Sequence, residues 1–403
     1  MRSRFRNRTF ALITIGIMVV AAEIIAYVFN VLVRDGRFAP EPTRKEFVDK
    51  LEEQYKAENF DPNLGWVPRK TDREANGARI SPDNPVSDRP CVSLYGDSTV
   101  FGDEVSHVAA WGNQLAKRIH CKVSNFGVGG YGTDQAYLRF IKNSSDPSSV
   151  VVLGILSENI VRNVNQNRAF LYSSAVGPLK PILWLDDAGQ LQFIPVPRLT
   201  IESHDKYIND PRSLFQKEFF IPDSSYYAEQ RVHFPYIINV PKALRYKRIY
   251  DGVLFYLIKS PPWYLDFYDP SHPSHALQVT ESIADHFVEN AKQRAKTPVI
   301  LFIPLARDIG NFLRTGKWVY APLYEWCRAR GHNCFDSGAA MVEKLGAQHI
   351  KEVGLCEYFC TRRFSEQGHY NEKGNVLLAE VSIRYLEPFL SNAKSGNLPN
   401  TKE

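Results

Sequence analysis

The chain has 403 residues, of which 44% are hydrophobic and 23% charged, and it carries a formal net charge of +5. This composition is typical of a folded globular protein, and the length allows one large domain with an insertion or two domains. Four arginines before residue 10 account for most of the excess charge, because the rest of the chain carries 45 basic and 44 acidic residues. Such a balance excludes the strongly basic surface of a nucleic-acid-binding protein.

The N-terminal segment predicts a membrane anchor. Arginines 2, 4, 6 and 8 precede an apolar run over residues 10–33, in which Glu23 is the single acidic residue. The run is long enough to cross a bilayer, and its basic flank predicts a cytoplasmic N-terminus with the rest of the chain periplasmic or extracellular. A cleavable signal peptide is the alternative, although the run is long for one and no good Ala-x-Ala site follows it.

Six cysteines follow the anchor, and none has the Cys-x2-Cys spacing of a zinc site. An even number in an oxidising compartment favours disulfides, for which 15 complete pairings exist. From their places along the chain we expect the pairs Cys91–Cys121, Cys327–Cys334 and Cys356–Cys360. We expect no metal site.

The order of the predicted elements favours an α/β protein with a parallel sheet. Residues 36–87 are rich in Pro and charged side chains and predict a stalk or loop-rich lead-in. Continuous apolar runs, typical of strands buried on both faces, then alternate with helical patterns. The predicted strands are 91–96, 122–127, 149–156 and 297–305, and the predicted helices are 109–119, 133–142, 275–295, 319–330 and 372–389.

A segment of about 110 residues interrupts this alternation. Residues 166–275 are too long for a structureless loop, so we expect an insertion with its own structure. The predicted domain therefore has two halves, 88–165 and 276–390, and a tail follows at 391–403.

The stretch "LYGDSTVFGDEV", residues 94–105, places Ser98 directly after the first predicted strand. Ligands of open parallel sheets bind outside the carboxyl ends of the strands. The loops at 125–135 and 156–163 leave the same edge, which predicts one site there. Ser98 is then either a nucleophile or a turn and helix-cap residue.

A nucleophilic serine needs a base, which a third group orients. The stretch "FSEQGHYNEKGN", residues 364–375, offers His369 as the base and Glu366, three residues earlier, as the orienting carboxylate. Asp336, after a possible fifth strand at "CF", is the alternative third member; otherwise it anchors a loop.

Hydrogen-bond donors must also face the oxyanion of the reaction. The candidates are the backbone N–H groups of Ser98 and Gly130 and the side-chain amide of Asn159. Gly130 suits this role because a residue without a side chain lets a substrate approach the backbone closely.

Together these stretches resemble the SGNH, or GDSL-type, hydrolase family. The resemblance lies in Gly96-Asp97-Ser98, in the glycine of Asn125-x-x-x-x-Gly130 and in His369, and it covers about 90–163 and 297–389. It implies a three-layer, flavodoxin-like fold and serine-dependent acyl chemistry on esters, without a metal or organic cofactor.

Two positions depart from the family pattern. The family usually shows Gly-x-Asn-Asp in its third block, where this chain reads "LSENI". The oxyanion asparagine is thus Asn159, displaced by one residue, or it is absent and Glu158 takes its place. The second departure is Glu366, where the family usually has an aspartate.

The predicted insertion carries the aromatic stretch "PPWYLDFYDP" at 261–270. The rings of Trp263 and Tyr264 are candidates for stacking on a sugar. Such a cluster also fits the core of the insertion itself or a contact with the membrane interface.

Three functions follow. The first is a membrane-anchored serine hydrolase acting on esters of an acylated exported carbohydrate. The second is an O-acyltransferase, such as an O-acetyltransferase, that uses the same acyl-serine step on an exopolysaccharide or cell-wall glycan. The third is a non-catalytic glycan-binding subunit of a polysaccharide-export assembly.

Overall fold

The structure is a computed structural model that describes residues 2–33, 42–68, 70–85, 89–171, 176–221, 234–243, 260–361 and 368–394. It divides into two compact units. The anchor unit comprises Met1–Glu53, Asn167–Pro178 and Arg198–Trp263, and the α/β unit comprises Gln54–Gln166, Leu179–Pro197 and Tyr264–Glu403.

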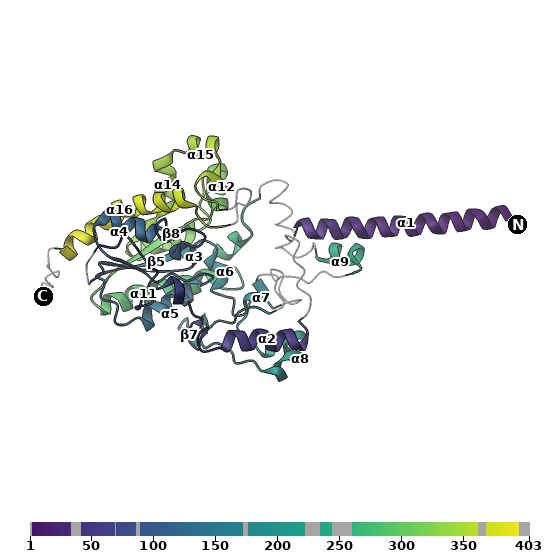
Figure 1. Ribbon diagram of the computed structural model, residues 1–403, viewed down its shortest axis with the longest axis horizontal. Helices are drawn as coiled ribbons and strands as arrows, with labels where there is room; N and C mark the ends of the chain where they lie inside the picture. The colour runs from purple at the N-terminus through teal and green to yellow at the C-terminus, as the bar shows by residue number, and fades with distance from the viewer. Residues whose placement is uncertain are drawn as a thin grey trace. The chain divides into compact units, whose positions relative to one another are not determined.

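A five-stranded parallel sheet forms the centre of the α/β unit (Figure 1). Its strands lie in the order β4-β3-β5-β8-β9, and every neighbouring pair is parallel. In chain order this is 2-1-3-4-5, the flavodoxin-like order. The predicted fold class is therefore confirmed. The strands are β3 (Val92–Tyr95), β4 (Val123–Asn125), β5 (Val150–Leu156), β8 (Thr297–Ile303) and β9 (Cys334–Asp336).

The four predicted strands coincide with β3, β4, β5 and β8, and the possible fifth strand is β9. Every residue of β3, β4 and β5 is buried. Continuous burial explains why these strands read as unbroken apolar runs, because helices cover both faces of the sheet.

Helices α4 (Trp111–Ile119), α14 (Ser337–Leu345) and α16 (Glu372–Lys394) pack together on one face of the sheet, and α5 (Thr133–Lys142) and α11 (Ala276–Gln293) on the other (Figure 1). On α11, Ile283, Phe287 and Ala291 recur every four residues and are fully buried. This spacing forms the apolar stripe that a helix needs to cover a sheet. The remaining helices of the unit are α3 (Ser98–Phe101), α6 (Asn159–Arg162), α12 (Ala306–Thr315), α13 (Ala321–Ala329) and α15 (Ala347–Val353).

Part of the predicted lead-in belongs to the α/β unit. The short strands β1 (Phe60–Asp61) and β2 (Gly65–Trp66) pair there, and the turn η1 (Lys70–Asp72) follows. Buried Arg79 donates hydrogen bonds to the carbonyl oxygens of Phe101 and Gly102, at the C-terminal end of α3. Residues 60–85 thus support the loop that follows Ser98.

The predicted insertion, 166–275, does not form a unit of its own. Part of it belongs to the anchor unit and part to the α/β unit. The hairpin of β6 (Ile182–Leu185) and β7 (Leu191–Ile194) belongs to the α/β unit, as do residues 264–275, which include most of η4 (Trp263–Tyr268). The 3-10 turn η5 (Leu355–Glu357) also lies in the α/β unit. The anchor unit has helices α1 (Arg2–Val33), α7 (Arg168–Leu171), α8 (His204–Asn209) and α9 (Tyr236–Ala243), turns η2 (Ile201–Ser203) and η3 (Pro211–Ser213), and most of α2 (Arg44–Tyr55).

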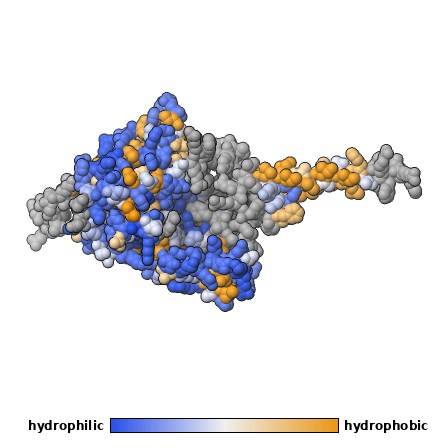
Figure 2. Space-filling model, viewed as in Figure 1, coloured by the Kyte–Doolittle hydropathy of each residue, from blue (hydrophilic) through white to orange (hydrophobic). Residues whose placement is uncertain are grey.

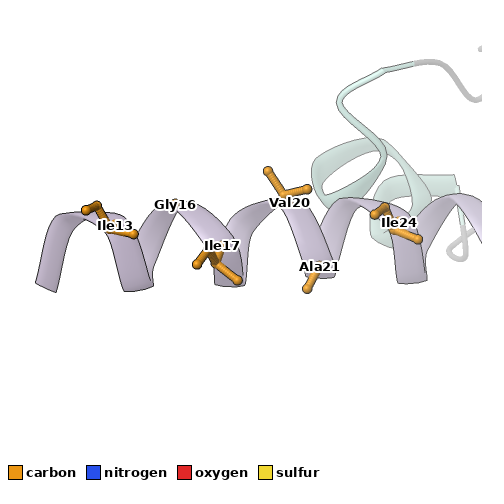
Figure 3. Close-up of a pocket in the computed structure, with 6 residues that line it drawn as sticks. All are labelled: Ile13, Gly16, Ile17, Val20, Ala21 and Ile24. Atoms are coloured by element: carbon orange, nitrogen blue, oxygen red, sulfur yellow. The ribbon is translucent and has the colours of Figure 1, made fainter. Parts of the chain in front are cut away.

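Helix α1 contains the predicted membrane span. Residues Thr9–Phe29 have a mean hydropathy of 2.4 and none of this span is buried, so its apolar side chains form the orange stretch along α1 in Figure 2. Figure 3 shows one stripe of it, with aliphatic side chains at five positions and Gly16 between them. By length and composition, α1 can cross a membrane once, as a retained anchor or a signal sequence.

Three disulfides are present, and they are the three expected pairs: Cys91–Cys121, Cys327–Cys334 and Cys356–Cys360. The first links the residues just before β3 and β4, two neighbouring strands of the sheet. All six cysteines are paired, as an oxidising compartment favours.

Candidate active site

Ser98 is the first residue of α3, directly after β3. The Asp97 carboxylate caps this helix by accepting hydrogen bonds from the backbone N–H groups of Thr99 and Val100. Ser98 is 6% exposed, and its hydroxyl has no hydrogen-bond partner within the described part of the chain. The backbone carbonyl oxygen of Ser98 accepts hydrogen bonds from the Gly102 and Asp103 N–H groups, whereas its hydroxyl is not used by the described part of the fold.

Arg162, at the end of α6, brings three loops together. Its guanidinium donates to the Asp97 carboxylate at 3.2 Å and to the Tyr131 carbonyl oxygen at 3.1 Å, and it lies 3.7 Å from the Glu158 carboxylate. Asp97 precedes Ser98, and Tyr131 follows Gly130. The three predicted loops therefore meet at one place, the carboxyl edge of the sheet.

The Asp97–Arg162 ion pair is almost completely buried. Burial raises the pKa of the Asp97 carboxyl, and the charge of Arg162 opposes that rise. Because Asp97 is occupied by this ion pair and by the helix cap, it holds the serine loop in place.

The glycine loop after β4 needs its glycines at two positions. Gly130 has φ +78°, in the left-handed region, and a Cβ there would lie 3.4 Å from the Trp66 ring. A Cβ at Gly127 would lie 2.4 Å from the backbone nitrogen of Phe101. Close backbone approach and left-handed geometry both favour glycine. Trp66 also donates its indole N–H to the Gly129 carbonyl oxygen at 3.0 Å, which fixes the ring beside the loop.

None of the three predicted oxyanion donors bonds to an acceptor among the described residues. Neither the Ser98 nor the Gly130 backbone N–H donates a hydrogen bond to any described residue. The Asn159 side chain is fully buried, and neither its Nδ2 nor its Oδ1 has a partner among those residues. A buried amide without partners costs about 1–3 kcal/mol, so such groups normally mark a bound water or ligand. Glu158 instead faces Arg162, which favours Asn159 of the two candidate residues in this loop.

His369 lies beside the carboxylate of Glu104, which the sequence analysis did not single out. Its Nδ1 is 3.1 Å from Oε2 of Glu104, in the loop that follows Ser98. Glu104 has φ +65°, which is uncommon for a residue with a side chain. The predicted partner, Glu366, lies outside the described residues. With Nδ1 bound to a carboxylate, Nε2 is the nitrogen that can accept a proton.

The segment around His369 is held by the start of α16. Asn375 accepts a hydrogen bond from the Trp111 backbone N–H at 3.1 Å and donates one to the Tyr370 carbonyl oxygen at 2.9 Å. A Cβ at Gly374 would lie 2.1 Å from the Tyr358 carbonyl oxygen, so the backbones meet there. These contacts explain the glycine and asparagine that follow the histidine. His369 and Ser98 make no hydrogen bond to each other in this structure.

Asp336 has a structural role. Its carboxylate caps α14 by accepting from the Ala339 backbone N–H at 2.9 Å and accepts the Tyr320 hydroxyl at 2.6 Å. Both bonds fit the loop-anchor interpretation.

The two predicted substrate-binding aromatics differ in their surroundings. Tyr264 is fully buried and its hydroxyl donates to Asp308 at 2.6 Å, so its ring has no free face for a sugar. The burial of Tyr264 contradicts the expectation that its ring stacks on a sugar. Trp263 is partly buried and packs edge-on against Phe220 at 6.4 Å between ring centroids, within the anchor unit.

Sequence reasoning missed three residues of the site: Glu104, Arg162 and Trp66. Arg162 follows Glu158 by four residues, the spacing of a helical ion pair, which is a usable local signal. Glu104 and Trp66 carry no such signal, because their partners are far away in the chain. Among the described residues, no group of three or more His, Cys, Asp or Glu side chains is suited to hold a metal ion.

The chain was compared with protein-family models, curated proteins and solved structures. No protein-family model and no curated protein matches the chain. A solved structure described as belonging to the G-D-S-L family of lipolytic proteins, from Desulfitobacterium hafniense DCB-2, matches 73% of this chain and 98% of its own. The sequence identity is 12% and the TM-score is 0.33.

Proposed function

We propose that the chain is a serine-dependent acyl-ester enzyme of the SGNH or GDSL type. Ser98 is the nucleophile and His369 the base, with Glu104 orienting the imidazole in place of the expected Glu366. The Ser98 and Gly130 N–H groups and the Asn159 amide stabilise the oxyanion. The observation that carries the proposal is that none of these donors has a partner within the described part of the chain, although one of them, Asn159, is fully buried.

The reaction follows from these positions. The Ser98 oxygen attacks the ester carbonyl while Nε2 of His369 takes the hydroxyl proton. Negative charge moves to the carbonyl oxygen, where preformed donors are worth about 3 kcal/mol each. The tetrahedral intermediate collapses, the imidazolium returns its proton to the departing alcohol, and the acyl group remains on Ser98. The hydroxyl group of water or of an acceptor then attacks the acyl-serine. The same steps in reverse release the acyl group from Ser98.

The Glu104 carboxylate supports this cycle by holding Nδ1. In that arrangement the imidazole presents Nε2 to the serine and its cation is stabilised after proton transfer. Ser98 and His369 are not hydrogen-bonded to each other here, and catalytic hydrogen bonds are often long until substrate binds.

The proposed location and substrate rest on the anchor and the disulfides. An apolar N-terminal helix with a basic flank and three disulfides favour a catalytic unit outside the cytoplasm. Esters of acylated exported carbohydrates are therefore the proposed substrate class. Whether the acyl group passes to water or to a sugar hydroxyl separates a hydrolase from an O-acyltransferase.

Mass spectrometry of the full-length protein in detergent, after brief incubation with p-nitrophenyl acetate, tests the nucleophile. We expect a gain of one acetyl group mapped to Ser98, absent in Ser98→Ala and retained in Ser106→Ala, a nearby serine outside the site. Turnover of the ester should fall by about 10⁴-fold or more in Ser98→Ala. Full turnover by Ser98→Ala would refute the proposal.

The acceptor is tested separately. Addition of a soluble glycan acceptor should divert acetyl from water to sugar if the enzyme is a transferase. The ratio of released acetate to p-nitrophenol would stay at one in a pure hydrolase. This measurement starts from the acyl-enzyme and so presupposes the first result.

A further inference from the structure

Glu23 is an acidic residue placed inside the apolar span of α1. It stands six residues before Phe29, the end of the span, so it lies about 9 Å along the helix from that end. Carboxylates inside a bilayer are costly and are normally paired or functional. The partner of Glu23 is therefore informative.

Helix α9 supplies that partner, and both helices belong to the anchor unit. One Glu23 carboxylate oxygen accepts the backbone N–H of Tyr236, and the other accepts that of Ile237 at 3.0 Å. These are the first two N–H groups of α9, which have no acceptor within their own helix. The rings of Tyr27 and Tyr236 also lie 5.3 Å apart. Figure 1 shows α9 alongside α1.

Exposed apolar side chains occur in α9 and in the residues just before it. Phe234, two residues before the helix, is 69% exposed, and Ile238 within it is 49% exposed. Its one charged residue, Lys242, lies close to the far end. An aqueous location leaves these apolar groups in water, whereas their position beside an apolar span matches lipid.

We propose that α9 is a second membrane-embedded element, packed against α1 in the outer part of the same bilayer, with lipid chains contacting Phe234 and Ile238. The inference rests on α1 being a retained span. If α1 spans, the groups bonded to Glu23 lie about as deep as Glu23 does. Backbone N–H groups at that depth need an acceptor, and Glu23 provides it.

The length of α9 agrees with this placement. Eight residues extend about 12 Å, which is enough for Lys242 to reach the interface from a buried N-terminus. The paired N–H groups and the positive end of the helix dipole also stabilise the Glu23 carboxylate. Membrane attachment thus involves two elements that are more than 200 residues apart in sequence.

Spin-label accessibility on the full-length protein in phosphatidylethanolamine–phosphatidylglycerol bilayers tests the placement. Because all six cysteines are paired, Ile238→Cys adds the single free thiol for the label. Lys45→Cys, on the exposed face of α2, is the aqueous control, and Val20→Cys in α1 is the lipid control. We expect the ratio of oxygen to nickel-chelate collisions at position 238 to be several-fold higher than at position 45 and to approach that at position 20. A ratio equal to that at position 45 would overturn the proposal.

Substitution of the acceptor tests the role of Glu23. With the label at 238, Glu23→Leu should lower the collision ratio several-fold, while Glu23→Gln, which keeps an oxygen acceptor, should retain most of it. Thr14→Leu is the matched control, because Thr14 bonds only to its own helix, at the Phe10 carbonyl oxygen. An unchanged ratio in Glu23→Leu would contradict the proposed anchoring. Acetylation of Ser98 measures the active site independently of these labels. Failure of the proposed function can therefore be distinguished from failure of the membrane placement.

Discussion

Ser157 and Asn159 lie two residues apart after β5, and both side chains are buried, but only one of them is satisfied. The Ser157 hydroxyl donates to the Asp308 carboxylate, which also accepts the Tyr264 hydroxyl at 2.6 Å and the Leu305 backbone N–H at 2.7 Å. We call these four residues the Asp308 network. The Asn159 amide has no partner among the described residues.

The difference separates a structural polar cluster from a binding group. A satisfied buried network rigidifies the fold, and its loss costs stability. An unsatisfied buried amide has no folded-state bond to lose, and it remains available to a ligand. The loop after β5 thus stabilises the unit through Ser157 and presents a donor through Asn159.

Among the variants that test this contrast, Asn159→Ala should have the largest effect. Loss of an oxyanion donor should lower kcat for p-nitrophenyl acetate by about 10²–10³-fold, or about 3–4 kcal/mol in the barrier. Thermal unfolding should change little, because the amide has no described partner. Steady-state kinetics and a melting curve on the full-length protein measure the two quantities.

Asn163→Ala is the matched control, four residues later and equally buried. Asn163 accepts the Asp134 backbone N–H at 3.2 Å and donates to the Thr280 hydroxyl at 2.8 Å. Its removal should lower the free energy of unfolding by about 1–3 kcal/mol. If Asn159→Ala destabilised as much as Asn163→Ala with kcat intact, the contrast between satisfied and unsatisfied groups would fail.

The Asp308 network predicts a pH dependence of stability. Burial raises the pKa of the Asp308 carboxyl to about 6 from its ordinary 3.8. Between about pH 4 and pH 6 the folded state binds more protons than the unfolded state, so the contribution of Asp308 to stability falls as pH rises. A difference of about two pKa units corresponds to about 3 kcal/mol.

Asp308→Asn, which resembles the protonated acid, removes this titration. The free energy of unfolding of the wild type minus that of the variant should fall by about 3 kcal/mol from pH 4 to pH 7. Denaturant titrations in detergent at several pH values measure it. A difference that rose with pH would show that the network stabilises the ionised carboxylate instead.

The smallest effect is expected at Glu104. Its carboxylate is 31% exposed, so Glu104→Gln should lower kcat by roughly 10- to 100-fold, less than the ~10⁴-fold known for a buried orienting aspartate. Glu366→Gln is the matched variant and should lower kcat by less than Glu104→Gln. The opposite ranking would return the orienting role to Glu366.

Several parts of the fold and site were predictable from local patterns. The strands were recognisable because continuous burial gives continuous apolar runs, as in β5. The disulfides followed from proximity along the chain or along neighbouring strands. Ser98 stood out by its position after a predicted strand, and Gly130 and His369 by the resemblance to the SGNH family. The left-handed φ of +78° at Gly130 gives a physical reason for the glycine there.

The missed features depend on contacts between distant segments. Glu104 and His369 are 265 residues apart, and their contact requires α16 to be held against the start of α4 through Asn375 and Trp111. The bond between Glu23 and α9 spans 213 residues. No periodic pattern in the sequence predicts such contacts, because periodicity shows only which face of a helix or strand is buried.

The sequence by itself determined the apolar span, the α/β order of elements, the three cysteine pairs and the edge of the sheet where Ser98 lies. These features depend on neighbours in the chain or on the rule that parallel strands end together. Only the tertiary structure decided which carboxylate contacts His369 and which buried polar groups are satisfied. Hydrogen bonds are short and directional, so a buried group is paired only when the whole fold brings a partner to it.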